Sequence, residues 1–326
     1  MKLGLTFDLR SEWLDAGYSE EETSEFDSPA TIQALEETIA GLGFQVERIG
    51  NVRALAAALV AGRRWDLVFN IAEGMHGFGR EAQVPALLDA WQIPYTFSDP
   101  LALTVALHKG ATKALLRGAG VPTAPFAIVT RESELDAVQL PWPRFVKPVA
   151  EGTSKGVGPW SLVHDPLALR ETFRLLSSRF RQPVVVEPFL PGREFTVGIV
   201  GTGAGAAQLG VMEVLFNEHA EMAVYSLVNK IECARRVRYL TPDDPESRRA
   251  GELALEAWRA LGCRDGGRVD VRSDGRGEPQ VIEVNPLPGL APGYSDLVLL
   301  STRAGISYEG LVERILRSAL QRLDVP

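Results

Sequence analysis

A hairpin signal near the C-terminal end constrains the fold of this chain more than any other feature of its sequence. Two valine-rich segments, 267–271 and 281–285, flank a Ser-Asp-Gly-Arg-Gly stretch at 273–277. β-Branched residues favour strands, and an Asp-Gly pair between two such runs favours a tight turn. The sequence therefore predicts two neighbouring antiparallel strands, and with them a sheet that is at least partly antiparallel.

Polar residues recur at alternate positions within both segments. Because side chains alternate between the faces of a strand, Arg268 and Asp270 share one face of the first strand. Glu283 and Asn285 share one face of the second, while the valines and Ile282 are expected to face a core. Two carboxylates and an amide oxygen suit Mg²⁺ that is shared with phosphates, so Asp270, Glu283 and Asn285 are predicted metal ligands. A polar outer sheet face with a surface ion pair is the alternative.

The first hundred residues carry a different pattern, in which short apolar runs alternate with segments of helical periodicity. These segments span 3–7, 29–42, 44–49, 51–61, 65–70 and 81–91. Strands that alternate with helices are typical of a parallel sheet, so the predicted fold class is α/β, mixed with the antiparallel hairpin. Neither G-x-G-x-x-G nor G-x-x-x-x-G-K-[ST] occurs, so a nucleotide would bind in another way.

An acidic stretch at 20–27 precedes one of the predicted helices. Ser28 can cap this helix, and Pro29 suits its first position. Charge runs are usually solvated, so the carboxylates of the stretch are interpreted as loop side chains in water.

Composition narrows the class of protein. The chain has 326 residues, enough for two or three domains, and its net charge of −8 argues against general nucleic-acid binding. No segment approaches the ~18 apolar residues of a membrane span, and the start lacks a signal-peptide core, so a cytoplasmic location without a membrane partner is expected. Cys233 and Cys263 lack C-x-x-C spacing, which predicts reduced structural thiols and no zinc site.

A glycine-rich loop at 151–158 follows a short strand that ends near Lys147. Glycines let backbone N–H groups turn toward an anion, and Thr153, Ser154 and Lys155 could add donors, so the loop is a candidate phosphate cover. An ordinary glycine-rich surface turn is the alternative.

Lysine is scarce in this chain. Of 34 basic residues only six are lysines, at positions 2, 109, 113, 147, 155 and 230, so a lysine here is more often present for its compact ammonium group. Lys109 begins a predicted helix and marks a domain boundary.

The strand at 184–190 could present backbone groups and apolar side chains to a flat base, and a plain buried strand is the alternative. The four histidines show no metal-ligand spacing.

Taken in order, these pieces resemble the D-alanine–D-alanine ligase family of ATP-grasp enzymes over nearly the whole chain. The matching segments are 93–99 with Lys109, 146–148 with 151–154, 187–190 with 194–197, Lys230, 262–263 with 267–270, and 283–285 with 288–289. The resemblance implies an ATP-grasp fold preceded by an N-terminal parallel α/β domain. The implied domains are 1–108 (N-terminal), 109–194 (central) and 195–326 (C-terminal, with the metal and catalytic residues), and ATP would lie between the last two.

The same resemblance implies roles for individual residues. Residues that would bind ATP are Lys109, Lys147, Glu151, Gly152, Ser154, Glu187, Phe189, Leu190, Glu194 and Lys230. Catalytic residues would be Thr153 in the covering loop, Lys230 on a mobile loop, and Arg268 with the backbone N–H of Gly289, which would stabilise a tetrahedral oxyanion. Asp270, Glu283 and Asn285 would hold two Mg²⁺ ions, with Mn²⁺ as a substitute.

The sequence departs from the family pattern where the amino-acid pocket is expected. Glu73-Gly74 replaces a His-Gly pair, Thr153 replaces a serine, and Ile231 replaces a tyrosine. The family's Asn-Thr-Ser-Pro-Gly is Asn-Pro-Leu-Pro-Gly at 285–289, with one extra residue before Ser295. The early glutamate that holds the first substrate's amine is matched by Glu25. Glu73 would add a negative charge to the pocket, unless it pairs with an arginine such as Arg80.

These observations predict an ATP- and Mg²⁺-dependent ligase that joins an amino-acid-like carboxylate to an amine through an acyl phosphate. Its partners would be these small molecules, and the family suggests a homodimer. One alternative is an ATP-grasp ligase that acts on a carboxylate other than an amino acid. Another is an idle nucleotide-binding module, although Arg268 argues against it because ATP binding alone needs no oxyanion donor.

Overall fold

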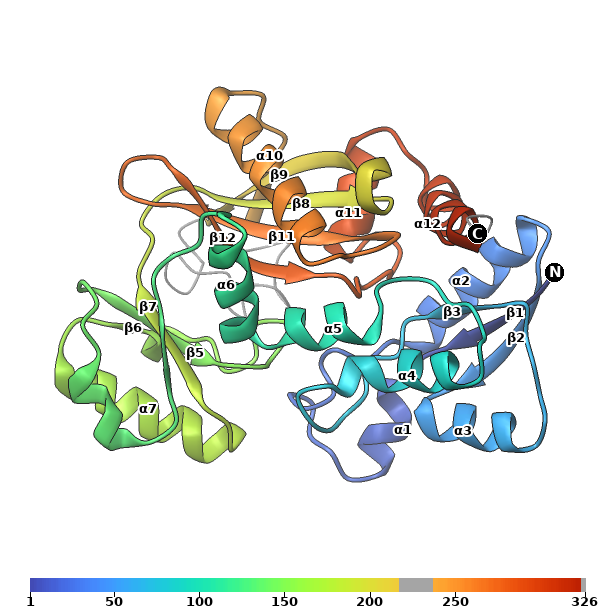
Figure 1. Cartoon of the computed structure of the whole chain (residues 1–326), viewed down its shortest axis with the longest axis horizontal. Coiled ribbons are helices and arrows are strands. Elements are labelled where there is room, and N and C mark those ends of the chain that lie inside the picture. Colours follow the sequence, from blue (N-terminus) through green and yellow to red (C-terminus); the bar gives the residue numbers. More distant parts are fainter. Residues whose placement is uncertain (217–236, 324–326) are drawn as a thin grey trace.

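The computed structural model describes residues 1–216 and 237–323. The alternating pattern of the first hundred residues forms a three-stranded parallel sheet of order β2-β1-β3 (Figure 1). Its strands are β1 (Lys2–Thr6), β2 (Gln45–Gly50) and β3 (Leu67–Asn70). The helices around it are α1 (Arg10–Asp15), α2 (Pro29–Gly41), α3 (Val52–Val60) and α4 (Gln83–Ala90), with a 3-10 turn η1 (Arg80–Ala82).

The predicted start of α2 is confirmed. The Ser28 hydroxyl accepts a hydrogen bond from the Thr31 N–H at 3.2 Å, and Pro29 occupies the first turn. Ser28 thereby satisfies one of the N–H groups that the first turn of a helix leaves without an intrahelical partner. The capping residue Ser28 directly follows the acidic stretch at 20–27. The start of α2 therefore fixes the backbone that carries the last carboxylates of that stretch.

A four-stranded antiparallel sheet of order β4-β7-β5-β6 forms the middle of the chain. Its strands are β4 (Ala127–Val129), β5 (Arg144–Pro148), β6 (Leu162–Val163) and β7 (Val184–Pro188). Helix α7 (Pro166–Phe180) covers one face of this sheet (Figure 1), whereas α5 (Pro100–Leu107) and α6 (Lys109–Gly118) place Ala106 and Leu116 in the core of the C-terminal sheet. The four-stranded sheet has an apolar core of its own, in which Val146 and Val186 meet Phe173 and Leu176 of α7.

A five-stranded antiparallel sheet of order β10-β9-β8-β11-β12 forms the C-terminal third. Its strands are β8 (Glu194–Val200), β9 (Ala207–Phe216), β10 (Val237–Leu240), β11 (Gly266–Ser273) and β12 (Pro279–Asn285). Helices α10 (Pro245–Ala260), α11 (Asp296–Arg303) and α12 (Tyr308–Leu323) pack around it. The predicted hairpin is β11 with β12, so its antiparallel pairing is confirmed.

The predicted position of Ile282 is wrong. Asp270 pairs with Glu283, but the next residue, Val271, pairs with Val281, so Ile282 is the extra residue of a β-bulge. The bulge interrupts the alternation of faces, and Ile282 lines a pocket instead of facing the core with Val281.

The N-terminal sheet and the C-terminal helices share one apolar core. Ile32 and Leu35 of α2 lie in the same cluster as Leu311 and Ile315 of α12. Buried Asp265, just before β11, reinforces this junction because it accepts hydrogen bonds from the Phe97 N–H and from Ser318 and Arg322 of α12. The division of the chain into three domains at 108 and 194 stays a prediction.

Candidate active site

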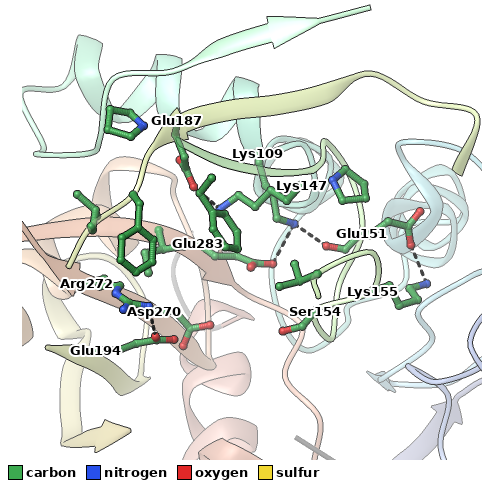
Figure 2. Close-up of a pocket in the computed structure, with 17 residues that line it drawn as sticks. Lys109, Lys147, Glu151, Ser154, Lys155, Glu187, Glu194, Asp270, Arg272 and Glu283 are labelled. Atoms are coloured by element: carbon green, nitrogen blue, oxygen red, sulfur yellow. Dashed lines mark hydrogen bonds and ion pairs between the residues drawn. The ribbon is translucent and has the colours of Figure 1, made fainter. Parts of the chain in front are cut away.

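A pocket lies between the four-stranded and five-stranded sheets (Figure 2), with about 810 Å³ of empty space, part of which is open solvent. Its lining includes most of the residues that were predicted to bind ATP: Lys109, Lys147, Glu151, Ser154, Glu187, Phe189, Leu190 and Glu194. Asp270, Glu283 and Ile282 line it from the five-stranded sheet. We call this space the first cavity.

Glu187 lies at the buried end of the first cavity between two ammonium groups. Its carboxylate is 2.7 Å from the Lys147 Nζ and 2.7 Å from the Lys113 Nζ. Burial alone would raise the pKa of Glu187, but the two ammonium groups outweigh it and lower that pKa to about 2. The carboxylate is therefore ionised at neutral pH and fixes the position of Lys147.

A second ion pair forms the opposite wall. The Arg272 Nη1 donates to Glu194 at 2.9 Å (Figure 2). The guanidinium of Arg272 lies over the Phe189 ring, 4.8 Å from the ring centroid. Phe189, Leu190 and Phe145 supply apolar surface beside this pair. A flat base between apolar side chains, with a carboxylate within reach of a hydroxylated sugar, fits this arrangement.

The glycine-rich loop covers one side of the first cavity. Thr153 and Ser154 both have positive φ angles, 48° and 57°, a conformation that costs a residue with a Cβ about 1 to 2 kcal/mol. Gly156 has a φ of +77°, and a Cβ there would lie 2.5 Å from Pro148. Such strain concentrates at sites that bind ligands, and it turns successive backbone groups toward one side.

Two cations hold this loop. The Lys109 Nζ donates to the carbonyl of Glu151 at 2.5 Å and lies 3.3 Å from Glu283 (Figure 2). The Lys155 Nζ lies 2.8 Å from the carboxylate of Glu151 and 2.9 Å from that of Glu25. Lys109 therefore stands between the loop and the polar face of the hairpin.

The hairpin brings together the four polar residues that the alternation predicted. Asp270 is directly opposite Glu283, and Arg268 is opposite Asn285. The Asn285 amide donates to Asp270 at 3.2 Å, which leaves its carbonyl oxygen for another partner. Within residues 1–216 and 237–323, no group of three His, Cys, Asp or Glu side chains could hold a metal by itself. Two carboxylates and one amide fit Mg²⁺, which takes its remaining ligands from phosphates and water.

A second cavity lies beyond Glu283, with about 1,730 Å³ of empty space, part of which is open solvent. The five-stranded sheet and the loop after it contribute Arg268, Asn285, Gly289, Ser295 and Asp296. The glycine-rich loop contributes Gly152 and Thr153, and the N-terminal part contributes Glu25, Asp27, Glu73 and Glu81. Glu283 lines both cavities, so the two spaces meet at the predicted metal site.

Arg268 and Gly289 lie on the same wall of the second cavity. The Arg268 Nε is 3.5 Å from Asp270 and 3.5 Å from Asp296. A Cβ at Gly289 would lie 2.9 Å from the Ser295 hydroxyl, which itself accepts from the Ala291 N–H at 3.0 Å. A side chain at position 289 would therefore displace the Ser295 hydroxyl that holds this turn.

The interpretation of the 20–27 stretch as solvated is wrong for Glu25. Its side chain is only 5% exposed, because it pairs with Arg80 at 3.2 Å and with Lys155 at 2.9 Å. Burial opposes ionisation, but these cations lower the pKa of Glu25 to about 2. Arg80 donates to Glu25 and to the Ala150 carbonyl rather than to Glu73, so the alternative pairing of Glu73 with Arg80 is not formed.

Sequence reasoning missed several residues at these cavities. Arg272 follows Arg268 and Asp270 at the same period of two, so the alternation could have identified it. Lys113, Asp27 and Glu81 carry no local signal, because each reaches its cavity through contacts between distant segments. Predicted residues Lys230 and Ile231 lie outside the described residues.

The polar hairpin face, the glycine-rich cover and the two joined cavities define the class of this protein. A family model described as the C-terminus of D-ala D-ala ligase matches residues 115–317. The chain belongs to the D-alanine–D-alanine ligase family and has the ATP-grasp fold. It is an ATP-dependent ligase that forms an amide bond, and family membership implies a divalent metal ion.

Individual relatives support this assignment. A D-alanine–D-alanine ligase from Gluconobacter oxydans is 36% identical over 258 residues, which cover 79% of this chain and 82% of that protein. The uncharacterized protein y4sG from Sinorhizobium fredii is also 36% identical, over 78% of this chain and 75% of its own length. The structure of a Bacillus anthracis D-alanine–D-alanine ligase complexed with ATP has the same fold, with a TM-score of 0.73 at 23% identity, covering 99% of this chain and 98% of that chain.

No helix among the described residues is both long and apolar enough to span a lipid bilayer.

Proposed function

We propose that the first cavity binds ATP and the second binds an amino-acid-like carboxylate together with an amine. The observation that carries the proposal is that Glu283 lines both spaces. A carboxylate in the second cavity would then meet the terminal phosphate of a nucleotide in the first. A divalent ion, or two Mg²⁺ ions, at Asp270, Glu283 and Asn285 would neutralise charge during phosphoryl transfer.

The chain's own groups fit both steps of such a reaction. In the first step, a carboxylate oxygen bonds to the γ-phosphorus and ADP leaves; Lys109 and Lys147 line the first cavity, where the phosphates would lie (Figure 2). In the second, the amine nitrogen attacks the acyl carbon, loses a proton and expels phosphate. Arg268 and the Gly289 N–H line the second cavity, where they would stabilise the oxyanion that develops between attack and expulsion.

The substrate pair is the finer part of the proposal. Glu73, Thr153 and the loop that starts at Asn285 all depart from the family pattern, and all line the second cavity. We therefore infer that D-alanine with D-alanine is not the preferred pair. A pocket that lacks a polar partner discriminates against the substrate that needs it, by up to several kcal/mol. A cytoplasmic homodimer is part of the same proposal and rests on the family resemblance.

The test is ADP formation across paired carboxylate and amine candidates, with mass analysis of the products. The panel should contain D- and L-amino acids, β-amino acids, diamines and carboxylates without an amine. We expect ADP release to require both partners and the product mass to equal their sum less one water. If no pair stimulates ADP release, the assignment of the second cavity to an amino-acid-like carboxylate and an amine is wrong. If D-alanyl-D-alanine forms with the highest kcat/KM, the inference about substrate choice is wrong.

A further inference from the structure

Three carboxylates line the N-terminal wall of the second cavity, and none of them has an ion-pair partner among the residues that the structure describes. Asp27 precedes α2, Glu73 follows β3, and Glu81 lies in η1. In the part of the chain that the structure describes, none of the three side chains makes an ion pair or a hydrogen bond. The Glu81 side chain is the most enclosed, since the residue is only 9% exposed.

The other charged residues of this cavity are balanced within the protein. Glu25 pairs with Arg80 and Lys155, Glu283 with Lys109, Asp296 with Arg268, and Arg10 with Glu20. Among the described residues that line the cavity, the unpaired charge is therefore confined to one wall. Carboxylates are rarely enclosed without a partner, because removing an isolated charge from water is costly. A cation bound from outside the protein would supply the partner that residues 1–216 and 237–323 do not provide.

The enclosure has a measurable effect on the three groups. Burial raises the pKa of Asp27 to about 7, helped by its neighbour Asp8. Burial also raises the pKa of Glu81 to about 7, although Arg80 opposes the change. The pKa of Glu73 is raised as well, by burial and by the nearby charges of Glu81 and Glu25. A ligand that brings positive charge would favour the ionised forms.

A bare metal ion is a poor candidate for this charge. Among residues 1–216 and 237–323, no three carboxylates lie close enough to hold one ion together. An organic cation can satisfy carboxylates that are spread along a wall, because an ammonium group has three donors and a guanidinium five. The cavity is also large enough for a side chain as well as two reacting groups.

We propose that one substrate of this ligase carries a cationic group in addition to its reacting group, and that Asp27, Glu73 and Glu81 bind that cation. The substrate class is a basic amino acid or a diamine. This inference rests on the proposed function, because it places the substrate in the second cavity.

Matched substrates test the charge preference directly. Lysine and norleucine have side chains of similar length but differ in the terminal ammonium, so each enantiomer pair isolates the effect of charge. We expect kcat/KM for ADP and amide formation to favour lysine over norleucine by about 10-fold or more. A norleucine preference, or no preference, overturns the inference while leaving the ligase function intact.

Single substitutions then test whether Asp27, Glu73 and Glu81 cause the preference for lysine over norleucine. Glu73→Gln, Glu81→Gln and Asp27→Asn each remove one negative charge at nearly constant shape, so the lysine-to-norleucine ratio should fall severalfold in each. Glu37→Gln removes the same charge from the exposed face of α2 and should leave the ratio unchanged. If one variant fails to fold, the other two still test the proposal. An unchanged lysine-to-norleucine ratio in both overturns the assignment of the cation site to these carboxylates.

Failure of the proposed function would give a different result. If no pair of amino acids supports ADP release, the cation site can still be tested by binding. Lysine and norleucine are each titrated calorimetrically into the full chain in the presence of a non-hydrolysable ATP analogue. Tighter binding of lysine, lost in Glu73→Gln, supports the cation site without the ligase chemistry. Equal or absent binding of both probes overturns the cation site.

Discussion

The two cavities that meet at Glu283 differ in whether their carboxylates form ion pairs. In the first, Glu187 lies between two lysines and Glu194 pairs with Arg272. In the second, Asp27, Glu73 and Glu81 have no such partners among the described residues. The balanced cavity is built from positions that match the family pattern, whereas the unbalanced one includes the positions that depart from it. A cavity that still binds the same cosubstrate, here ATP, can keep its ion pairs. A cavity whose substrate has changed can instead contain carboxylates that have no ion-pair partner among the described residues.

The largest expected effect concerns the residues where the cavities meet. Asp270→Asn should lower metal-dependent turnover by more than about 10²-fold, because an amide cannot replace the charge of a carboxylate that faces a metal ion and phosphates.

Arg268→Ala should lower kcat by ~10²-fold with a smaller change in ATP affinity, as expected for the loss of an oxyanion donor.

Steady-state kinetics and ATP titration separate these two outcomes. Arg276→Ala, in the exposed turn of the same hairpin, is the matched control and should retain full activity. An Arg268→Ala enzyme that changes only in ATP binding would contradict the oxyanion role. Normal metal-dependent turnover in Asp270→Asn would remove the metal assignment.

The balanced cavity should depend on its charge pairs for stability. Glu187→Gln leaves Lys113 and Lys147 enclosed without their counter-ion, which should lower the free energy of unfolding by about 3 to 5 kcal/mol at pH 7. The pKa of Glu187 is lowered to about 2, so its contribution is present above the unfolded value of about 4.5 and is lost as pH falls toward 2. Urea unfolding at pH 7 and pH 3 measures both, and the gap between wild type and variant should be narrower at pH 3.

The unbalanced cavity should show the reverse behaviour. The pKa of Glu81 is raised to about 7, so the empty site loses stability as pH rises from about 4.5 through 7. Glu81→Gln should therefore raise the free energy of unfolding at pH 8 by on the order of 1 to 3 kcal/mol. The charged groups that act on Glu81 are Arg80, Glu25, Lys109, Glu283 and Glu73. Chemical denaturation without substrates at pH 8 and pH 5 tests this, and a variant less stable than wild type at pH 8 would show that Glu81 is already balanced.

The smallest expected effect lies in the loop that covers the first cavity. Gly156→Ala places a Cβ 2.5 Å from Pro148 and 2.8 Å from Phe180, so the loop must shift and the KM for ATP should rise by roughly 10-fold. Gly120 has the same φ of +77° but open space around its Cα, so Gly120→Ala separates crowding from backbone strain. Equal KM values for ATP in the two variants would show that the loop does not position the nucleotide.

Long elements with strong end signals could be predicted from the sequence. Helix α7 carries such signals, because Asp165 accepts from the N–H groups of Leu167 and Ala168 while Pro166 occupies the first turn. Helix α5 was not predicted, since Pro100–Leu107 is almost uniformly apolar and lacks a helical period. The bulge at Ile282 could not be predicted either, because neither strand carries a glycine or other local signal there.

The same contrast holds for the candidate site. The alternation of polar residues predicted the shared face of Arg268, Asp270, Glu283 and Asn285, since one strand pair fixes their geometry. The buried triad of Glu187 with Lys113 and Lys147 could not be predicted, because three separate elements supply it. The wall of Asp27, Glu73 and Glu81 depends on how the N-terminal loops fold over the hairpin. Only Glu73 was suspected, through its departure from the family pattern.

The apolar core that α2 shares with α12 has a consequence for how products leave. Separating the N-terminal and C-terminal sheets would expose Ile32, Leu35 and Ile315 to water and break the hydrogen bonds of Asp265. The four-stranded sheet has its own core, and on the side of the second cavity it is held by a few polar contacts and by a small apolar cluster in which Leu107 meets Val149 and Ala150. We therefore expect the two outer sheets to move as one rigid body and the middle sheet to act as the hinged part. Since this sheet carries the loop that walls both cavities, one opening motion would release ADP and the amide product together.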